Sequence, residues 1–179
     1  MRLPAIKRDD LAPEDQKLWD RIMAGRSSGG GGPYSALIHA PKLADHLSTL
    51  ENYFRSGAAL AESDREIIIL ATVREFDARF PWTRHEIRGR QVGLGEEVIE
   101  TLRAKGSLER FAPRERLLIE IVRSLLRDHR LSKELFTFGL AELGAEKMVE
   151  MVALIGHYCT ISSVANAFEV APPEGSRTF

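Results

Sequence analysis

Histidine is the side chain whose proton affinity best suits acid–base chemistry near neutral pH, and the chain contains five of them. His85 is the strongest candidate, because Trp82 lies one helical turn before it on a helix predicted to begin at Pro81. A histidine there could move a proton, while the tryptophan excludes water and lies flat against an unsaturated ligand. The alternative is an ordinary, partly exposed helix histidine.

Glu66 has two interpretations that do not exclude each other. Ser63 and Glu66 have the spacing of a capping box, in which each side chain accepts a hydrogen bond from the other residue's backbone amide. Alternatively, Glu66 is partly buried beside the apolar segment 67–73, where the loss of hydration raises the proton affinity of a carboxylate. The second interpretation makes Glu66 a candidate for acid–base work.

Arg74 and Arg88 are candidate anion-binding residues, because a guanidinium can hold a substrate carboxylate through two parallel hydrogen bonds. Each could equally form a surface ion pair. His39 could face a cavity below the glycine-rich loop 29–32. His157 lies in the most apolar predicted helix, where a hydrogen-bonded core histidine is the simpler interpretation.

The spacing of the remaining metal-binding and nucleophilic residue types predicts no metal site and no cofactor. No two histidines have the i, i+4 spacing of a helical metal clamp, and no cysteine pair is available for a structural zinc site. Cys159 is the single cysteine, which excludes an internal disulfide and a two-thiol redox motif within one chain. The one Gly-x-Ser-x-Gly string, at 25–29, lies in the glycine-rich loop without the preceding strand of a nucleophile elbow, so acyl transfer through serine has no support.

Length and charge narrow the class of protein. A compact chain of 179 residues buries roughly 70% of its extended surface, enough for a single domain over residues 1–179. Its 25 Lys and Arg balance 26 Asp and Glu, so the formal charge of -1 predicts neither a nucleic-acid partner nor an anionic membrane. Apolar runs such as 67–73 are too short to span a bilayer, and residues 1–10 lack a signal peptide's apolar stretch. We expect a soluble, cytoplasmic protein.

Helical periodicity dominates, and glycine and proline cluster at boundaries, which predicts an all-α, compact multi-helix bundle. The core is expected over about 10–170, a mobile loop over 25–33, and a tail over 172–179 that frays or docks on a neighbour. The expected helices cover residues 13–24, 41–56, 64–76, 81–92, 96–104, 113–128, 132–143 and 145–168.

The pattern also contains an internal near-repeat. Residues 64–69 align with 113–118 at an offset of 49, and 96–100 align with 146–150 after one residue of slippage. Both halves are expected to contain a helix, a shorter helix, a glycine break and a further helix. Trp82 and His85 have no counterparts in the second half, so any chemistry belongs to the first copy.

Several segments together carry a likeness to a known family. They are REIIIL (65–70), WTRH (82–85), GL (93–94) and EEVI (96–99), with GGPY (31–34) and IHAP (38–41) upstream and Tyr158 and Asn166 in the last helix. In order and spacing, these segments resemble the carboxymuconolactone decarboxylase superfamily, which includes the alkyl hydroperoxidase D-like proteins. The resemblance covers roughly residues 10–170.

The resemblance implies an all-helical protomer of the alkyl hydroperoxidase D-like type that forms a homo-oligomer, often a trimer or hexamer. In the peroxidase branch, a glutamate, a Cys-x-x-Cys pair and a histidine form a proton relay to a thiolate. On this chain the glutamate falls at Glu66 and the histidine at His85, whereas the thiol positions fall at Ala78 and Pro81. Peroxide reduction by that relay should therefore be absent.

An acid–base pair without the thiols is similar to the decarboxylase-like branch, whose members act without a cofactor on small unsaturated carboxylic acids or lactones from aromatic degradation. By this resemblance, His85 moves the proton and Glu66 orients it. The residues expected to bind the substrate are Trp82, Tyr34, His39, Arg74 and Arg88.

Two alternative functions stay open. One is a peroxiredoxin or alkylhydroperoxidase-type antioxidant activity, which requires Cys159 to react or to pair across subunits. The other is a non-catalytic small-molecule-binding or structural member of the fold. A separate argument also predicts an oligomer. The helices around 67–73 and 148–155 are apolar over most of their circumference, so contact with another subunit would remove apolar surface from water.

Overall fold

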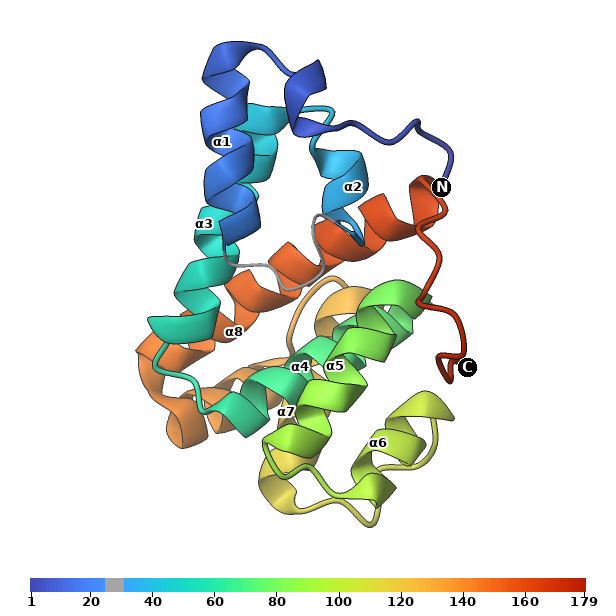
Figure 1. Ribbon diagram of the computed structural model, residues 1–179. Helices are drawn as coiled ribbons and strands as arrows, with labels where there is room; N and C mark the ends of the chain where they lie inside the picture. Colours follow the sequence, from blue (N-terminus) through green and yellow to red (C-terminus); the bar gives the residue numbers. More distant parts are fainter. Residues whose placement is uncertain (25–30) are drawn as a thin grey trace.

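The structure is a computed structural model of the 179-residue chain and describes residues 1–24 and 31–179. Across these two ranges the chain forms α-helices and one short 3-10 helix without any strand, which confirms the all-α prediction (Figure 1). The elements are η1 (Arg8–Asp10), α1 (Pro13–Ala24), α2 (Tyr34–Leu37), α3 (Pro41–Ser56), α4 (Glu62–Glu75), α5 (Arg79–Gln91), α6 (Glu96–Arg103), α7 (Pro113–Arg127) and α8 (Lys133–Ala167).

Helix α4 is the centre of the bundle. It packs against α5, α6, α7 and α8, and its residues 66–73 are all buried. Full burial of an isoleucine such as Ile68 stabilises the fold by roughly 1.5–3 kcal/mol, so this helix contributes a large part of the core. The expectation that segment 67–73 needs another subunit to cover it is wrong, because these four helices cover it within one chain.

Helix α8 is long but not continuous in conformation. Gly144 has φ 76° and ψ 168°, which bends the chain between the two predicted helices 132–143 and 145–168. Among the described helices it is the only one long and apolar enough by composition to cross a membrane, yet 56% of its most apolar window is buried inside the protein. It packs against α2, α3, α4, α5 and α7, which is the placement of a core helix.

The N-terminal helices form a second group on the other side of α8 (Figure 1). Helix α1 packs along α3, and the short helix α2, which the sequence did not reveal, contacts α3 and α8. Gly32 precedes α2 with φ +77°, and a Cβ there would collide with the ring of Phe80. The predicted mobile loop covers 25–33 and includes the glycines 29–32. Residues 25–30 of this loop lie outside the described residues.

The near-repeat corresponds to a repeated order of elements. Helices α4, α5 and α6 are followed by α7 and the two halves of α8, and Gly93 and Gly144 mark the breaks with φ of 88° and 76°. The leading helices α4 and α7 pack side by side, and Arg114 of α7 bonds Asp64 of α4 at 2.7 Å.

Two local predictions are corrected. Helix α4 begins at Glu62 after Ala61, without a side-chain cap, so Ser63 and Glu66 form no capping box. The tail docks on its own chain, because Phe179 lies edge-on to Trp82 with ring centroids 5.5 Å apart and receives Arg74 over its face at 4.0 Å.

Candidate active site

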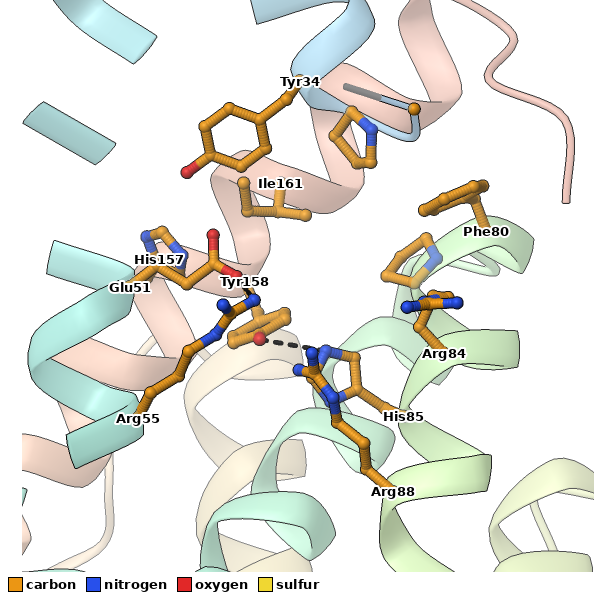
Figure 2. A pocket seen from close by; sticks show the side chains of 13 residues that line it. Tyr34, Glu51, Arg55, Phe80, Arg84, His85, Arg88, His157, Tyr158 and Ile161 are labelled. Atoms are coloured by element: carbon orange, nitrogen blue, oxygen red, sulfur yellow. Dashed lines mark hydrogen bonds and ion pairs between the residues drawn. The ribbon is translucent and has the colours of Figure 1, made fainter. Parts of the chain in front are cut away.

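Three side chains from three helices form a buried hydrogen-bonded chain. Nδ1 of His85 on α5 lies 2.7 Å from Oε2 of Glu66 on α4, and Nε2 lies 3.0 Å from the hydroxyl of Tyr158 on α8 (Figure 2). The exposed fractions are 5% for His85, 9% for Glu66 and 6% for Tyr158. The central helix, the helix after it and the last helix therefore meet at one imidazole.

The partners of the imidazole fix the direction of the hydrogen bonds when the histidine is neutral. A carboxylate only accepts, so Nδ1 of His85 carries the hydrogen and donates to Glu66. Nε2 is then an acceptor for the hydroxyl of Tyr158. This arrangement matches an oxygen acid, an imidazole and an orienting carboxylate in series, which is a layout suited to proton transfer.

Burial of the Tyr158 ring raises the pKa of its hydroxyl well above 10.0. The negative charges of Glu51 and Glu66 act in the same direction, and the nearby guanidiniums of Arg88 and Arg55 oppose them. Tyr158 therefore carries its proton throughout the neutral range.

The chain of three residues opens onto a small cavity of about 90 Å³ (Figure 2). Tyr34 and Ile161 lie on one side of it, and Phe80, in the first turn of α5, lies across from them. A space this small suits a ligand of few non-hydrogen atoms, since sites for drug-sized molecules measure roughly 300–1,000 Å³. The lining residues are Gly31, Pro33, Tyr34, Glu51, Arg55, Phe80, Pro81, Arg84, His85, Arg88, His157, Tyr158 and Ile161.

Positive charge gathers at this cavity. Arg84 and Arg88 flank His85 on α5, both are half-buried, and neither forms an ion pair with a carboxylate in the described part of the chain. Arg55 on α3 reaches in from the opposite side and bonds Glu51 at 2.5 Å. Half-buried guanidiniums without an internal counter-ion favour an anionic ligand, because a carboxylate would restore the hydrogen bonds lost on burial.

A second cavity of about 270 Å³ also borders His85. Arg65, Ile69 and Gln91 line it, and it shares Arg88, His85 and Tyr158 with the first cavity. Glu66 lines the second cavity and is absent from the lining of the first. The Glu66 end of the hydrogen-bonded chain therefore faces the second cavity, whereas Tyr158 lines both.

Four residues predicted for the site lie at this imidazole. His85 and Glu66 are directly bonded, and Tyr34 and Arg88 line the first cavity with His85. Glu66 is buried because its side chain points from α4 towards α5. Its carboxylate is bonded to the His85 ring instead of a backbone amide of its own helix.

Trp82 does not reach the cavity, which corrects a prediction. It is fully buried on another face of α5, donates its Nε1 hydrogen to Glu86 at 3.1 Å and packs beside Arg103 and Phe179. Three residues of α-helix turn by about 300°, so Trp82 and His85 point about 60° apart, and the tryptophan ring is directed towards Arg103 and Phe179.

Arg74 and His39 also lie elsewhere. Arg74 donates to the carbonyl of Arg103 at 2.7 Å and pairs with Asp77, because it lies in the last turn of α4, two turns beyond Glu66. Nε2 of His39 lies 3.0 Å from the carbonyl of Pro4, on the exposed side of the loop that precedes α3. Neither residue lines either cavity at His85.

Four further residues at the cavity were not predicted as site residues: Tyr158, Arg84, Arg55 and Glu51. Arg84 had a local signal, since it precedes His85 and lies four residues before Arg88 on one helix. Glu51 and Arg55 also have i, i+4 spacing, but nothing local indicates that α3 faces α5.

The two positions at which the resemblance implies cysteines carry no reactive side chain. They are Ala78, which is fully buried at the start of α5, and Pro81, which lines the first cavity. Partial burial raises the pKa of the Cys159 thiol, so little of it is the reactive thiolate at neutral pH. Within residues 1–24 and 31–179, no group of three His, Cys, Asp or Glu side chains could hold a metal ion.

Comparison with known proteins bears on the fold. No family model matches the sequence, and no curated protein matches it. The structure is similar to a solved "alkylhydroperoxidase AhpD core", an uncharacterized peroxidase-related protein from Ralstonia eutropha JMP134, with a TM-score of 0.78. The match covers 97% of this chain and 92% of that chain at 18% identity. The chain therefore has the AhpD-like fold, as predicted.

Proposed function

We propose that the protein is a cofactor-free acid–base catalyst of the carboxymuconolactone decarboxylase-like kind, which decarboxylates or isomerises a small unsaturated carboxylic acid or lactone. The observation that carries the proposal is the buried chain Tyr158–His85–Glu66, which ends at a small cavity beside two arginines that have no carboxylate partner among the described residues. A ligand placed there meets a proton source and positive charge together.

The reaction needs both features. When the bond to a departing carboxylate breaks, negative charge spreads into the conjugated ligand and a proton must reach a carbon atom. The imidazole of His85, oriented by Glu66, is the centre of that proton transfer. Arg84 and Arg88 are placed to hold a retained carboxylate, or a lactone oxygen on which charge develops. Positioned groups of this kind contribute about 10²–10⁴-fold to the rate.

Turnover of muconolactone-type acids, β-keto acids and hydroxy acids by wild-type protein tests the proposal. His85→Gln removes the proton-transferring ring with little change of volume, and kcat should fall by a factor on the order of 10²–10⁴. His46→Gln is the matched control, because His46 is exposed and lies outside both cavities at His85. Equal rates for wild type and His85→Gln would contradict the proposal.

A thiol peroxidase activity is the alternative, and the raised pKa of Cys159 weighs against it. Alkylation of Cys159 should leave any slow consumption of hydroperoxide unchanged. Loss of hydroperoxide consumption on alkylation would favour the peroxidase instead. A non-catalytic role would be favoured if small unsaturated acids bind without turnover.

We also infer that the protein forms a homo-oligomer. Helix α8 exposes the apolar side chains of Phe136, Phe138, Leu140, Val149 and Val152, with Phe138 at 66% and Val149 at 70%. Burial of such side chains against a second copy removes apolar surface from water. Light scattering at micromolar concentration should give a trimer or hexamer, and a clean monomer would contradict the inference.

A further inference from the structure

We propose that Tyr158 is the residue that hands the proton to the bound molecule, and that His85 acts through it as a positioning and reloading residue. This inference rests on the proposed function and concerns the same site. It assigns the contact with the reacting carbon to a phenol hydroxyl on α8, where the family resemblance implies a histidine on α5.

The imidazole has no nitrogen left for a ligand. Nδ1 of His85 is bonded to Glu66 at 2.7 Å and Nε2 to Tyr158 at 3.0 Å, and the ring is 5% exposed. A ligand in the first cavity that took a proton from Nε2 would have to displace the hydroxyl of Tyr158. That hydroxyl is buried and would then lose its partner, at a cost of about 1–3 kcal/mol.

The hydroxyl of Tyr158 has the placement and the protonation state of the donor. Tyr158 lines the first cavity with Arg84 and Arg88, which are the groups placed to hold an anion. The His85 and Tyr158 rings are perpendicular, with centroids 5.0 Å apart, so the phenol oxygen meets the imidazole at its edge. Burial keeps the phenol neutral, because it raises the pKa of Tyr158, and only a neutral phenol can donate.

Protonation of His85 turns the chain into a loaded donor. The imidazolium has hydrogen on both nitrogens, so Nδ1 donates to the carboxylate of Glu66 while Nε2 donates to the oxygen of Tyr158. The phenol hydrogen is then free to donate into the cavity. In this state His85 donates to Tyr158 and Tyr158 donates into the cavity, while Glu66 accepts the hydrogen bond from the other nitrogen of the imidazolium.

The transfer balances with one proton from water as its only further reactant. As the ligand's carbon–carboxylate bond breaks, its electron pair stays on the ligand and carbon dioxide leaves. The ligand carbon takes the phenol hydrogen of Tyr158, and the phenol oxygen takes the Nε2 hydrogen of His85. His85 returns to the neutral form bonded to Glu66, and one proton from water reloads it before the next turnover.

The second cavity gives reloading a route of its own. Glu66, at the far end of the chain, lines that cavity with Gln91 and Arg65 and does not line the first. A ligand that fills the first cavity therefore leaves the Glu66 end open to protons. The charged and titratable groups that line the two cavities with His85 and Tyr158 are Tyr34 of α2, Glu51 and Arg55 of α3, Glu62, Arg65 and Glu66 of α4, Arg84 and Arg88 of α5, and His157 of α8.

Kinetics of Tyr158→Phe form the first arm of the test. This variant keeps the ring and removes only the hydroxyl, so kcat should fall by a factor on the order of 10²–10⁴ while KM stays within about twofold. Tyr53→Phe is the matched control, because its hydroxyl also bonds a buried carboxylate, Glu150 at 2.5 Å, but Tyr53 lines neither cavity at His85. Wild-type kcat in Tyr158→Phe, with kcat lost in His85→Gln, would overturn the inference and leave the proposed function standing.

The second arm needs no substrate. Protein labelled with ¹³C at the phenol carbon of tyrosine is titrated by NMR, and the Tyr158 signal is assigned by its loss in Tyr158→Phe. If protonation of His85 reverses the hydrogen bond, the Tyr158 signal should shift along the same curve as the His85 ring signals, and the shift should vanish in His85→Gln. A Tyr158 signal that does not change as the His85 ring titrates would overturn the inference. This result is decisive even if no substrate is turned over.

Discussion

Nε2 of His85 lies 3.0 Å from the hydroxyl of Tyr158, although 73 positions separate the two residues in the chain. The contact joins α5, which follows the central helix, to the last helix α8. Both residues line the small cavity, and Glu66 is bonded to the other nitrogen of the imidazole. A carboxylate, an imidazole and a neutral phenol thus follow one another in a single hydrogen-bonded chain.

Replacement of Glu66 should impair the relay without changing the shape of the site. Glu66→Gln keeps the side-chain volume but removes the charge that stabilises a protonated His85. We expect kcat to fall by a factor on the order of 10² or more, because the imidazole loses the acceptor that orients it. Steady-state kinetics measure the effect. Glu97→Gln, on the exposed start of α6, should leave kcat unchanged.

Alkaline conditions should reveal the buried phenol. The pKa of Tyr158 is raised in the folded state, so the neutral phenol favours folding fully below about pH 10, and this contribution is lost as the pH rises above that value. Wild type should therefore lose stability more steeply than Tyr158→Phe between about pH 9 and about pH 11. Urea denaturation at several pH values measures the slopes. Parallel slopes in the two proteins would show that the phenol ionises as it does in the unfolded chain.

Arg88 should contribute to ligand binding more than to folding. Arg88→Gln removes a guanidinium that has no carboxylate partner among the described residues, so the melting temperature should change little. A hydrogen bond to a charged group is worth about 1.5–3 kcal/mol, so KM for an anionic substrate should rise about tenfold or more. Arg90→Gln is the control, because Arg90 pairs with Glu96 at 2.8 Å on the surface. A wild-type KM in Arg88→Gln would exclude it as an anion-binding residue.

Gly32 should be sensitive to substitution for two separable reasons. Its φ of +77° costs an alanine about 1–2 kcal/mol, and the added Cβ would also push against the Phe80 ring. Gly93→Ala isolates the first cost, since Gly93 has φ +88° and no atom within 4 Å of an added Cβ. Gly32→Ala should therefore lower the melting temperature more than Gly93→Ala, and it should also raise KM because Phe80 lines the cavity. Equal losses in the two variants would show that Phe80 moves aside freely.

The sequence indicated the fold well where the signal was local. The apolar run at 67–73 correctly predicted a central helix, because a helix that is apolar on all sides is stable only when covered on all sides. Gly93 and Gly144 correctly marked breaks, because their positive φ suits glycine. The short helix α2 was missed, since four residues leave no periodicity to detect.

The site was less predictable because its contacts join distant parts of the chain. Glu66 had a capping-box pattern, but its carboxylate is bonded to His85, 19 positions away. Trp82 and His85 had the spacing of neighbours on one helix, yet their side chains point in different directions from α5. The tail residue Phe179 packs against the tryptophan, and nothing in the sequence indicated that contact. Tyr158 belongs to a helix whose approach to α5 depends on the packing of the whole bundle.

The most direct measurement of the central claim follows one proton. A small unsaturated lactone or β-keto acid is incubated in D₂O with wild type, His85→Gln and Tyr158→Phe, and the product and carbon dioxide are quantified together. The hydrogen-bonded chain predicts one deuterium at the carbon that loses carbon dioxide per turnover in wild type, at rates on the order of 10² or more above both variants. Equal rates and equal deuterium incorporation in all three proteins would contradict it.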